Sequence, residues 1–571
     1  MAGHMDVNEL SRRYAALKSE RSGWDTAWRS LAELFLPCRW RSDDDRTAHA
    51  QPRLNGRLVN STGVLAMRTL AAGMQGGMTS PVRPWFRLRL KGRDGTAPGL
   101  NAWLEEVTAR MQRVLHESNF YNAVHGLYAD LGTFGTGLLI ETADENGVHF
   151  HRVRAGEYVL DVNGKNEVDT FFRRLFMTAR QLVDRFGDAC PESVRRVAGA
   201  RGGLGTTARY NVIHGVFPRK ERNGAALGPG SLPWASVYWL ADGAESGRAA
   251  LLSEGGYRSF PAFAPRWDVN GADVYGRSPA MDVTPDCKML QAMTSTLRRM
   301  QHKMADPPVV IAASLRGFGV NLDPGGKNFV DMGGLMQGGA PVMPVQQPDP
   351  AALNYTMQGI GDVEAIVRDG LYVDLFRMLI DDDRRQITAT EIQAKQQEKM
   401  ILIGPVVERL HKELLEPLVT RTYLLMEEYG VLPELPAELS GEELDVTFES
   451  VLAQAQKLTA TSAIDQGMAF VFQAAQARPE ALDVLNVDAM VKSYLERVGM
   501  PEGCINDDDA ILQNREARAQ AQEKAEEQAQ AQAAMRQMVD MSAAAKNLGQ
   551  TPTGADGETL MGTLLGGMGS L

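Results

Sequence analysis

The sequence predicts an α+β fold in which helices predominate. Apolar residues recur at three- and four-residue steps in several long segments, which is the pattern of amphipathic helices. Between about residues 138 and 270 the pattern changes to short runs that are typical of strands. The chain has 571 residues, of which 44% are apolar and 23% charged. It therefore has the composition of a globular protein and is long enough for two to four domains.

The first 118 residues are predicted to form three helices and a strand. The first helix ends before Pro37 and carries one apolar face, made of Leu10, Tyr14, Leu17, Trp24, Trp28, Leu31 and Phe35. A second helix lies in "STGVLAMRTLAAGMQGGMTSP" and ends at Gly76-Gly77 and Pro81. "PWFRLRL" alternates as a strand does, and residues 102–118 are again helical.

Turn and capping signals organise the region rich in strands. "EYVLDVNGKNEVDTFFRRLF" indicates a hairpin, in which Asn163-Gly164 would supply the positive φ angles of a tight turn. Thr178 and Gln181 have the spacing of a capping box and predict a short helix. "VIHGVF" and "ASVYWL" are two further predicted strands.

Two helices flank a module rich in Gly and Pro in the middle of the chain. The first is predicted to pack through a stripe of Met289, Met293, Leu297, Met300 and Met304, and to stop at Asp306-Pro307-Pro308. "VVIAA" is a predicted strand inside the module. The second helix begins near residue 350, and its apolar face comprises Leu353, Met357, Ile360, Val363, Val367 and Leu371.

The last third of the chain is also predicted to be helical. Thr388 and Glu391 form a capping-box pattern before a long helix that Pro405 and Pro417 should kink and Gly430 should end. Its apolar face comprises Ile403, Val407, Leu410, Leu414 and Leu418. A final Ala/Gln-rich segment has strong helix formers but little apolar surface, so it needs neighbouring copies to be stably folded.

Composition and motifs give no support to an enzyme. The formal charge of -11 argues against simple DNA binding, although not against a protein through which DNA passes. The four cysteines are widely spaced, which indicates buried thiols in a reducing compartment. No apolar run is long enough to span a bilayer. Asp381-Asp382-Asp383 could offer oxygen ligands to a cation, but the run lacks the spaced ligands and glycine of a calcium loop, which favours a solvated turn.

Four stretches resemble one known family, in its order. They are "LAAGMQGGMTSPVRPWFRL" (70–88), "SNFYNAVHGLYADLGTFGTGLLIE" (118–141), "RWDVNGADVYGRSPA" (266–280) and "ITATEIQAKQQEKMILIGPVVERLHKELLEPLVTRTYLLMEEYG" (387–430). The family is that of the head-to-tail connector, or portal, proteins of short-tailed bacteriophages, of the T7-like and P22-like kind. The resemblance is weaker in the C-terminal region.

The resemblance implies a ring of identical subunits, usually twelve, at one vertex of the capsid. Such a ring nucleates capsid assembly with the major capsid and scaffolding proteins. It docks the terminase large subunit, passes double-stranded DNA during packaging and ejection, and then binds a tail adaptor protein. It carries no cofactor, metal or catalytic residue, contacts no membrane, and is assembled in the host bacterial cytoplasm before it resides in the virion.

The family's parts map onto the predicted elements. We expect the parts to follow in this order: a wing at 1–280, a first stem helix at 281–306, a clip at 307–348, a second stem helix at 349–376, a tunnel loop at 377–390, a long kinked helix at 391–430, a crown at 431–510, a barrel-like helix at 511–547 and a flexible tail at 548–571.

These parts suggest which residues meet DNA and partners. Candidates for the tunnel loop are Arg377, Asp381, Asp382, Asp383, Arg384 and Arg385. The arginines would contact phosphates and the aspartates would repel them; the alternative is that these charges pair within the loop or with neighbouring subunits. Candidates for the stem channel are Arg298, Arg299 and Lys303, for which salt bridges between subunits are the alternative. Candidates for docking of the terminase or adaptor on the clip are Arg316, Lys327, Asn328 and Phe329.

Two other functions remain open from the sequence alone. A tail-side adaptor ring would use the same kind of assembly, but such proteins are usually much shorter. A metal-dependent enzyme would need an acidic site, for which Asp381 to Asp383 is the candidate.

Overall fold

A computed structural model describes most of the chain, in two compact units at 1–470 and 471–571. The described residues are 6–37, 39–40, 58–90, 98–200, 207–222, 228–244, 248–311, 317, 319–322, 327, 342–344, 349–380, 402–434, 436, 444–449, 468, 470–471, 473, 478, 486–498 and 508–550.

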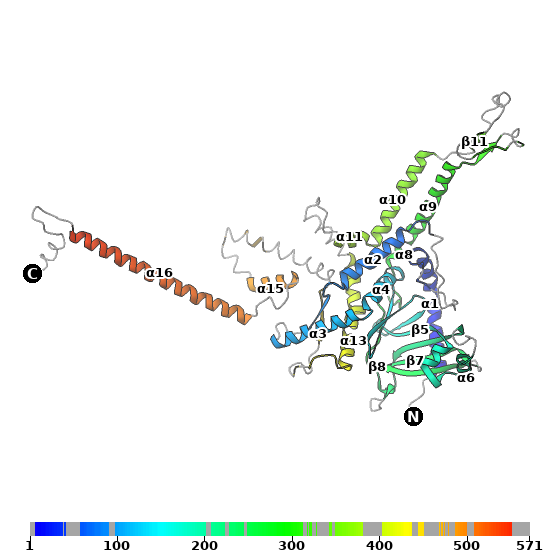
Figure 1. Ribbon diagram of the computed structural model, residues 1–571, viewed down its shortest axis with the longest axis horizontal. Helices are drawn as coiled ribbons and strands as arrows, with labels where there is room; N and C mark the ends of the chain where they lie inside the picture. The colour runs from blue at the N-terminus through cyan, green and yellow to red at the C-terminus, as the bar shows by residue number, and fades with distance from the viewer. Residues whose placement is uncertain are drawn as a thin grey trace, which may run out of the picture. The chain divides into compact units, whose positions relative to one another are not determined.

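The first unit is mixed α+β, as predicted (Figure 1). Its helices are α1 (Val7–Phe35), α2 (Thr62–Met78), α3 (Pro98–Glu117), α4 (Phe120–Phe134), α5 (Ala179–Phe186), α6 (Glu192–Ala198), α8 (Pro279–Asp282), α9 (Thr284–Ala305), α10 (Pro350–Gly370), α11 (Val373–Ile380) and α13 (Glu416–Glu428). Residues 402–410 are also helical, and a π-helical turn, His411–Leu415, joins them to α13. Two 3₁₀ turns are η1 (Gly187–Ala189) and η2 (Pro229–Ser231).

The strands form one sheet of five, one of three and two pairs. The five-stranded antiparallel sheet consists of β4 (Tyr158–Val162), β5 (Val168–Thr178), β6 (Arg209–Pro218), β7 (Trp234–Ala244) and β8 (Arg248–Tyr257), in that order. The three-stranded sheet has the order β3 (Gly147–Val153), β2 (Leu138–Asp144) and β9 (Ala262–Phe263). The pairs are β1 (Phe86–Leu90) with β12 (Leu444–Phe448), and β10 (Val309–Ile311) with β11 (Val342–Pro344).

Helices cover both faces of the five-stranded sheet. Successive side chains of a strand point to opposite faces, so Ile213 and Val212 belong to different cores. Ile213 packs with Leu10 and Leu17 of α1, whereas Val212 packs with Leu182 of α5. The predicted N-terminal helix and its apolar face are therefore confirmed, and so is the capping box of α5, in which Thr178 and Gln181 bond each other reciprocally.

Helix α4 lies at the centre of the main core. Twelve of its 15 residues are buried, and a helix that is buried on all sides belongs to the interior rather than the surface. Helices α1, α2, α3, α11 and α13, the three-stranded sheet and strands β1 and β4 also contribute residues to this core. The predicted apolar face of the long helix is confirmed, because Ile403, Val407, Leu410, Leu414 and Leu418 are all fully buried.

One local prediction needs correction. The β4–β5 hairpin forms, but Asn163-Gly164 does not supply positive φ angles: the residue with positive φ in this turn is Asn166, at 61°. The Asn163 side chain instead accepts bonds from the backbone of Lys165 and Glu167, which closes a wider turn.

Strand β12 was not predicted. It lies in the range expected to be crown and pairs with β1, which lies in the range expected to be wing.

The second unit contains two described helices, α15 (Val487–Val498) and α16 (Asp508–Gln550). Helix α16 has 43 residues, and nearly all of its described side chains are exposed. The predicted Ala/Gln-rich helix is confirmed as a helix. Throughout the described part of the chain, no helix is apolar over a stretch that could cross a bilayer.

Candidate functional site

Helices α9 and α10 lie side by side and project from the rest of the first unit, with β10 and β11 at their far end (Figure 1). We call α9 and α10 the stem hairpin. Between them lie the buried side chains of Leu290, Leu297, Ile360 and Val363. The helices also approach closely, since a Cβ at Gly359 would lie 3.1 Å from the Cε of Met293.

The predicted methionine stripe forms only part of the packed face of α9. The buried residues are Cys287, Leu290, Thr294 and Leu297, whereas Met289 is 45% exposed. Leu297 is common to both sets, and the partly buried Met293 packs against the same cluster. The prediction is therefore confirmed at Met293 and Leu297 and wrong at Met289, because methionine spacing alone does not fix which side of a helix meets its neighbour.

Both helices of the stem hairpin are interrupted at the same level. Helix α9 is preceded by a break at Val283, and α10 ends at Gly370, where a Cβ would come within 2.4 Å of the Val283 side chain. Tyr372, which follows, has a φ of 56°, an unusual angle for a bulky residue. The predicted second stem helix at 349–376 is thus two helices, α10 and α11.

Helix α11 is held against α2 by close packing. Phe376 is fully buried, and a Cβ at Gly73 of α2 would come within 2.1 Å of its ring. Arg377, the next residue, is exposed on the same helix. The predicted tunnel loop at 377–390 therefore begins in a helix, because α11 continues to Ile380.

The segment before α2 fastens the base of the stem hairpin. The Gln291 Oε1 accepts bonds from the backbone N of Val59 and Asn60, at 2.9 and 3.0 Å. The Asn60 Nδ2 donates to Glu364 Oε1 at 2.9 Å, so one asparagine bridges α9 and α10. The polar side chains of Gln291, Asn60 and Glu364 at the base thus form hydrogen bonds within the subunit.

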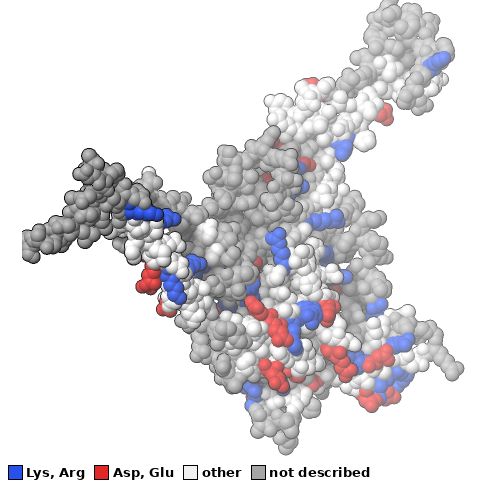
Figure 2. Space-filling model, turned by 60° about the vertical axis from the view of Figure 1, so that its left-hand side comes forward, with Lys and Arg blue, Asp and Glu red and all other residues white. Residues whose placement is uncertain are grey.

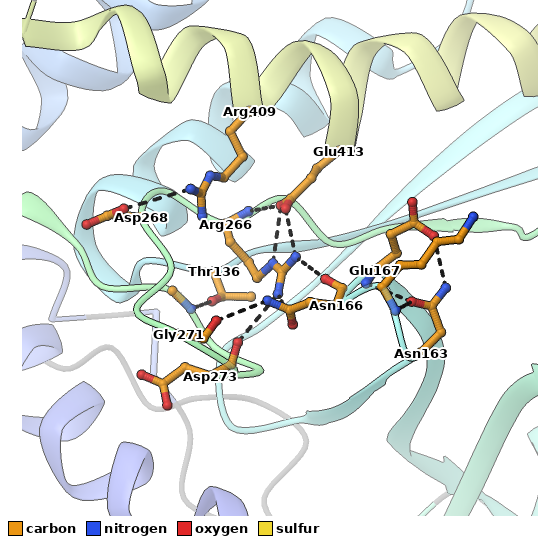
Figure 3. Close-up of polar contacts among 12 residues, drawn as sticks. Thr136, Asn163, Asn166, Glu167, Arg266, Asp268, Gly271, Asp273, Arg409 and Glu413 are labelled. Atoms are coloured by element: carbon orange, nitrogen blue, oxygen red, sulfur yellow. Dashed lines mark hydrogen bonds and ion pairs between the residues drawn. The ribbon is translucent and has the colours of Figure 1, made fainter.

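Arg266 joins three separate segments of the first unit (Figure 3). Its guanidinium meets both carboxylate oxygens of Glu413, with Nη2 to Oε1 at 2.7 Å and Nε to Oε2 at 3.3 Å. Its Nη2 also donates to the backbone O of Asn166 at 2.7 Å. The Arg266 side chain is 4% exposed, so this pair lies where solvent screening is weak.

Local backbone features place the partners of Arg266. The carbonyl of Asn166 faces the arginine from the turn in which Asn166 has its positive φ. Glu413 lies in the π-helical turn, four residues before Pro417, which has no N–H to donate back to the Glu413 carbonyl. A turn and an irregular helix thus converge on one side chain.

Two glycines form a close backbone crossing beside this network. A Cβ at Gly135 would lie 2.1 Å from the carbonyl O of Gly276, and Gly135 has a φ of 76°. A Cβ at Gly276 would lie 2.4 Å from the carbonyl O of Gly135. The Thr136 hydroxyl accepts a 2.7 Å bond from the Gly276 N. Two of the four stretches that resemble the family, 118–141 and 266–280, therefore contact each other at this crossing.

A second buried pair connects β2 with α13. Glu141 is fully buried, its Oε1 accepts a 2.9 Å bond from the Thr422 hydroxyl, and its Oε2 lies 3.5 Å from the Nε of Arg421. Burial raises the pKa of Glu141 to about 7, and Arg421 opposes that rise. Burial also lowers the pKa of Arg421. This pair brings stretch 387–430 against stretch 118–141.

The structure describes part of the predicted site residues. Arg298, Arg299 and Lys303 are exposed on α9, and Lys327 is exposed. Arg377 is exposed on α11. Asp381, Asp382, Asp383, Arg384 and Arg385 lie outside the described residues, as do Arg316, Asn328 and Phe329. Their roles stay predictions.

Sequence reasoning missed the anchoring network. Arg266 opens one of the stretches that carry the resemblance, so its position could have been noticed. Glu413 lies 147 residues away from Arg266, on the polar side of an amphipathic helix, and no local pattern pairs the two.

Charges of both signs are mixed on the described surface. On the face drawn in Figure 2, Lys and Arg lie interspersed with Asp and Glu over the body of the first unit. Among the described residues, no three His, Cys, Asp or Glu side chains gather as a metal ion would require. Two of the cysteines, Cys190 and Cys287, are described, and both are buried free thiols.

Comparisons with known proteins agree over nearly the whole chain. Residues 7–505 match the family model described as "Bacteriophage head to tail connecting protein". The chain is 35% identical over 531 residues to the "Probable portal protein" of Bordetella phage BPP-1, which covers 92% of this chain and 93% of that protein. It is 34% identical over 558 residues to the "Portal protein" of Salmonella phage epsilon15, with 96% of each chain covered.

Solved structures give weaker matches. A chain from the virion of a native gene transfer agent particle aligns with a TM-score of 0.33 and 10% identity, covering 72% of this chain and 86% of that one. A chain from the neck of an empty particle aligns with a TM-score of 0.31 and 12% identity, covering 71% and 86%.

The sequence matches and the order of the four stretches lead to one conclusion. The family consists of structural proteins of the virion at the junction of head and tail, not of enzymes. This chain belongs to the bacteriophage head to tail connecting proteins, the portal proteins.

Proposed function

We propose that twelve copies of this chain form a closed ring at one vertex of the capsid, and that double-stranded DNA passes through it during packaging and ejection. The observation that carries the proposal is the family match over residues 7–505. The stem hairpin supports it, because a helical pair that projects from a compact body can line a channel when copies surround an axis.

The charge of the chain suits a conduit. Each copy carries a formal charge of -11, so a ring is strongly acidic and repels the phosphates of DNA. A conduit must release every phosphate contact as the duplex advances, and tight binding would oppose this. A few basic side chains can centre the duplex. We propose Arg377 of α11 and Arg298 of α9, both exposed, for this role.

The far end of the stem hairpin is the proposed docking region. Residues 307–348 would form the clip, of which the β10–β11 pair and Lys327 are described. The proposed partners are the terminase large subunit during packaging and a tail adaptor protein afterwards. The ring would also nucleate assembly of the major capsid and scaffolding proteins.

Imaging of the purified full-length protein tests the ring. We expect closed rings with a central channel in negative-stain electron microscopy, and a mass near twelve chains by native mass spectrometry. A protein that stays monomeric at every concentration and salt condition, including in the presence of capsid and scaffolding proteins, would contradict the proposal.

In-vitro packaging tests the role in DNA passage. Arg377→Glu should slow DNA entry into proheads while rings still form, because a new carboxylate repels the phosphates. Arg196→Glu is the matched control, since Arg196 is also exposed but lies on α6, away from the stem hairpin. Equal packaging rates for the two variants would show that Arg377 does not contact the DNA in the channel.

A further inference from the structure

We propose that the stem hairpin has two complementary edges, and that the edge formed by α9 of one copy binds the edge formed by α10 of the next copy. The inference rests on the proposed ring and deepens it, because it assigns surfaces to the contact between subunits. It also assigns Arg299 and Lys303 to that contact rather than to DNA.

The first edge lies on α9 and is basic. Helix α9 carries four Lys or Arg residues and one acidic residue. At about 100° per residue, Arg299 lies about 200° around the helix from the buried Leu297, and Lys288 lies as far from the buried Leu290. Lys303 follows Arg299 by one turn. Lys288, Arg299 and Lys303 are all exposed, and we call these three residues the basic edge.

The second edge lies on α10 and is acidic and apolar. Helix α10 carries three acidic residues and one arginine. Asp362 lies about 200° from the buried Ile360 and is exposed. Tyr355 and Ile366 share its side of the helix, at spacings of seven and four residues, and are 81% and 51% exposed. We call Tyr355, Asp362 and Ile366 the acidic edge.

The basic edge faces away from α10, because it lies opposite the buried Leu290 and Leu297 through which α9 meets α10. The acidic edge lies on the flank of α10, where Asp362 is about 100° around the helix from the buried Val363 and Ile366 is about 100° from the buried Val367. One subunit therefore cannot pair its own edges. Two different surfaces of a subunit give a heterologous contact, which propagates from copy to copy and closes into a ring when the rotation allows.

In the single subunit, side chains on both edges are exposed and make few contacts. Arg299 donates a hydrogen bond to the nearby Thr296 hydroxyl, at 3.4 Å on the same helix. Tyr355 exposes most of its ring to water, although a tyrosine is a typical anchor of protein interfaces. By contrast, Glu364 on the flank of α10 is occupied by Asn60 and Arg368. The outward-facing Arg299 and Tyr355 are thus the side chains that have room for a partner from another subunit.

A second copy fits these observations better than DNA does. A duplex would neutralise the basic edge alone and would leave Tyr355 and Ile366 in water. A neighbouring stem hairpin supplies cations to Asp362 and the aliphatic stems of Lys288, Arg299 and Lys303 to the apolar side chains. Both edges are then used at once.

Paired charge reversals test the contact in the full-length protein. One variant, R299E/K303E, makes both edges acidic. The other, Q358K/D362K, makes both edges basic, since Gln358 is exposed one turn before Asp362. Each variant alone should need a concentration at least about tenfold higher than the native chain for half of its subunits to assemble, because like charges meet at every contact.

An equal mixture of the two variants should assemble again. The acidic α9 edge of the first variant then meets the basic α10 edge of the second, and the remaining contacts pair the native edges. Rings of alternating subunits should appear, and tagging one variant should show both in each ring. Circular dichroism and the urea midpoint verify that each variant is folded before mixing.

The outcomes separate this contact from the proposed function. If either variant alone forms rings at the native concentration, or if both fail and the mixture fails too, the paired edges are wrong while the native ring stands. If R299E/K303E forms rings and packages DNA slowly, the basic edge serves the duplex instead. R298E/H302E, on the flank of α9, is the matched control for assembly alone, because Arg298 is proposed to contact DNA; this variant should form rings at the native concentration. A native chain that forms no ring overturns the proposed function itself.

Discussion

The body of the first unit and the stem hairpin differ in where their arginine and aromatic side chains lie: buried and paired in the body, exposed on the stem hairpin. In the body, Arg266 and Arg421 are buried and pair with carboxylates from distant segments. In the stem hairpin, Arg299 is exposed and Tyr355 is 81% exposed. The body thus completes its interactions within one chain, whereas the outer edges of the stem hairpin do not. Substitutions in the body should reduce the stability of a single subunit, and those on the edges should not.

The largest expected effect is at the glycine crossing in the body. Gly135→Ala should lower the free energy of unfolding by about 4 kcal/mol, because the new Cβ overlaps the Gly276 carbonyl and the φ of 76° disfavours alanine. The urea midpoint measures this. Gly147→Ala is the control: it has a φ of 127° but no atom within 4 Å of the new Cβ, so about 1 kcal/mol is expected. Equal losses would show that the crossing is looser than described.

The buried arginine network should give the next largest effect. Arg266→Ala leaves Glu413 without its cation and the Asn166 carbonyl without a donor, which should cost about 3 kcal/mol. Arg277→Ala removes an ion pair to Asp282 whose side chains are 61% and 60% exposed, and should cost less than about 1 kcal/mol. Urea denaturation compares the two. A loss at Arg277 as large as that at Arg266 would contradict the distinction drawn by burial.

Glu141 should make the body pH-sensitive. Its folded pKa of about 7 exceeds its ordinary value of 4.5, so the folded state keeps this proton to a higher pH than the unfolded state does. The stability it contributes is present below pH 4.5 and is lost as the pH rises to about 7, by about 3 kcal/mol. Glu141→Gln should remove this part of the pH dependence, measured by urea unfolding at pH 5 and pH 8. An unchanged difference between native and variant at the two pH values would assign the dependence to other groups.

The smallest effect on unfolding is expected at the stem hairpin. Tyr355→Ser should change the free energy of unfolding of a dissociated subunit by no more than about 0.5 kcal/mol, since most of this side chain is already in water. Tyr158→Ser, at a residue 1% exposed, should cost several times more. If the two substitutions cost the same, the outer edge of α10 is covered within the subunit.

Local patterns in the sequence predicted the elements well. The three- and four-residue spacing located α1 and the face of the long helix, where Val407 and Leu414 are fully buried. The capping box at Thr178 was visible because both partners lie within one turn. These successes share a cause: the interacting residues are close in the chain, so their spacing records the geometry.

Contacts between distant segments could not be predicted in the same way. Strand β1 pairs with β12, more than 300 residues later, and nothing in "PWFRLRL" specifies that partner. The pairing of Arg266 with Glu413 depends on a π-helical turn, and the positive φ of Asn166 depends on a turn wider than the Asn-Gly pair suggested. Methionine spacing located only part of the packed face of α9, namely Met293 and Leu297, because neighbouring helices, not residue type, decide which side is buried.

The coincident breaks at Val283 and Leu371-Tyr372 have a mechanical consequence. Helix α9 has 22 residues and is therefore about 33 Å long, at about 1.5 Å per residue. A rigid rotation at the level where both helices are interrupted would therefore displace its far end the most. A rotation of about 10° at that level moves the far end of α9 by about 6 Å while every helical hydrogen bond beyond it stays intact. A small adjustment at the base is thus amplified at the strands β10 and β11.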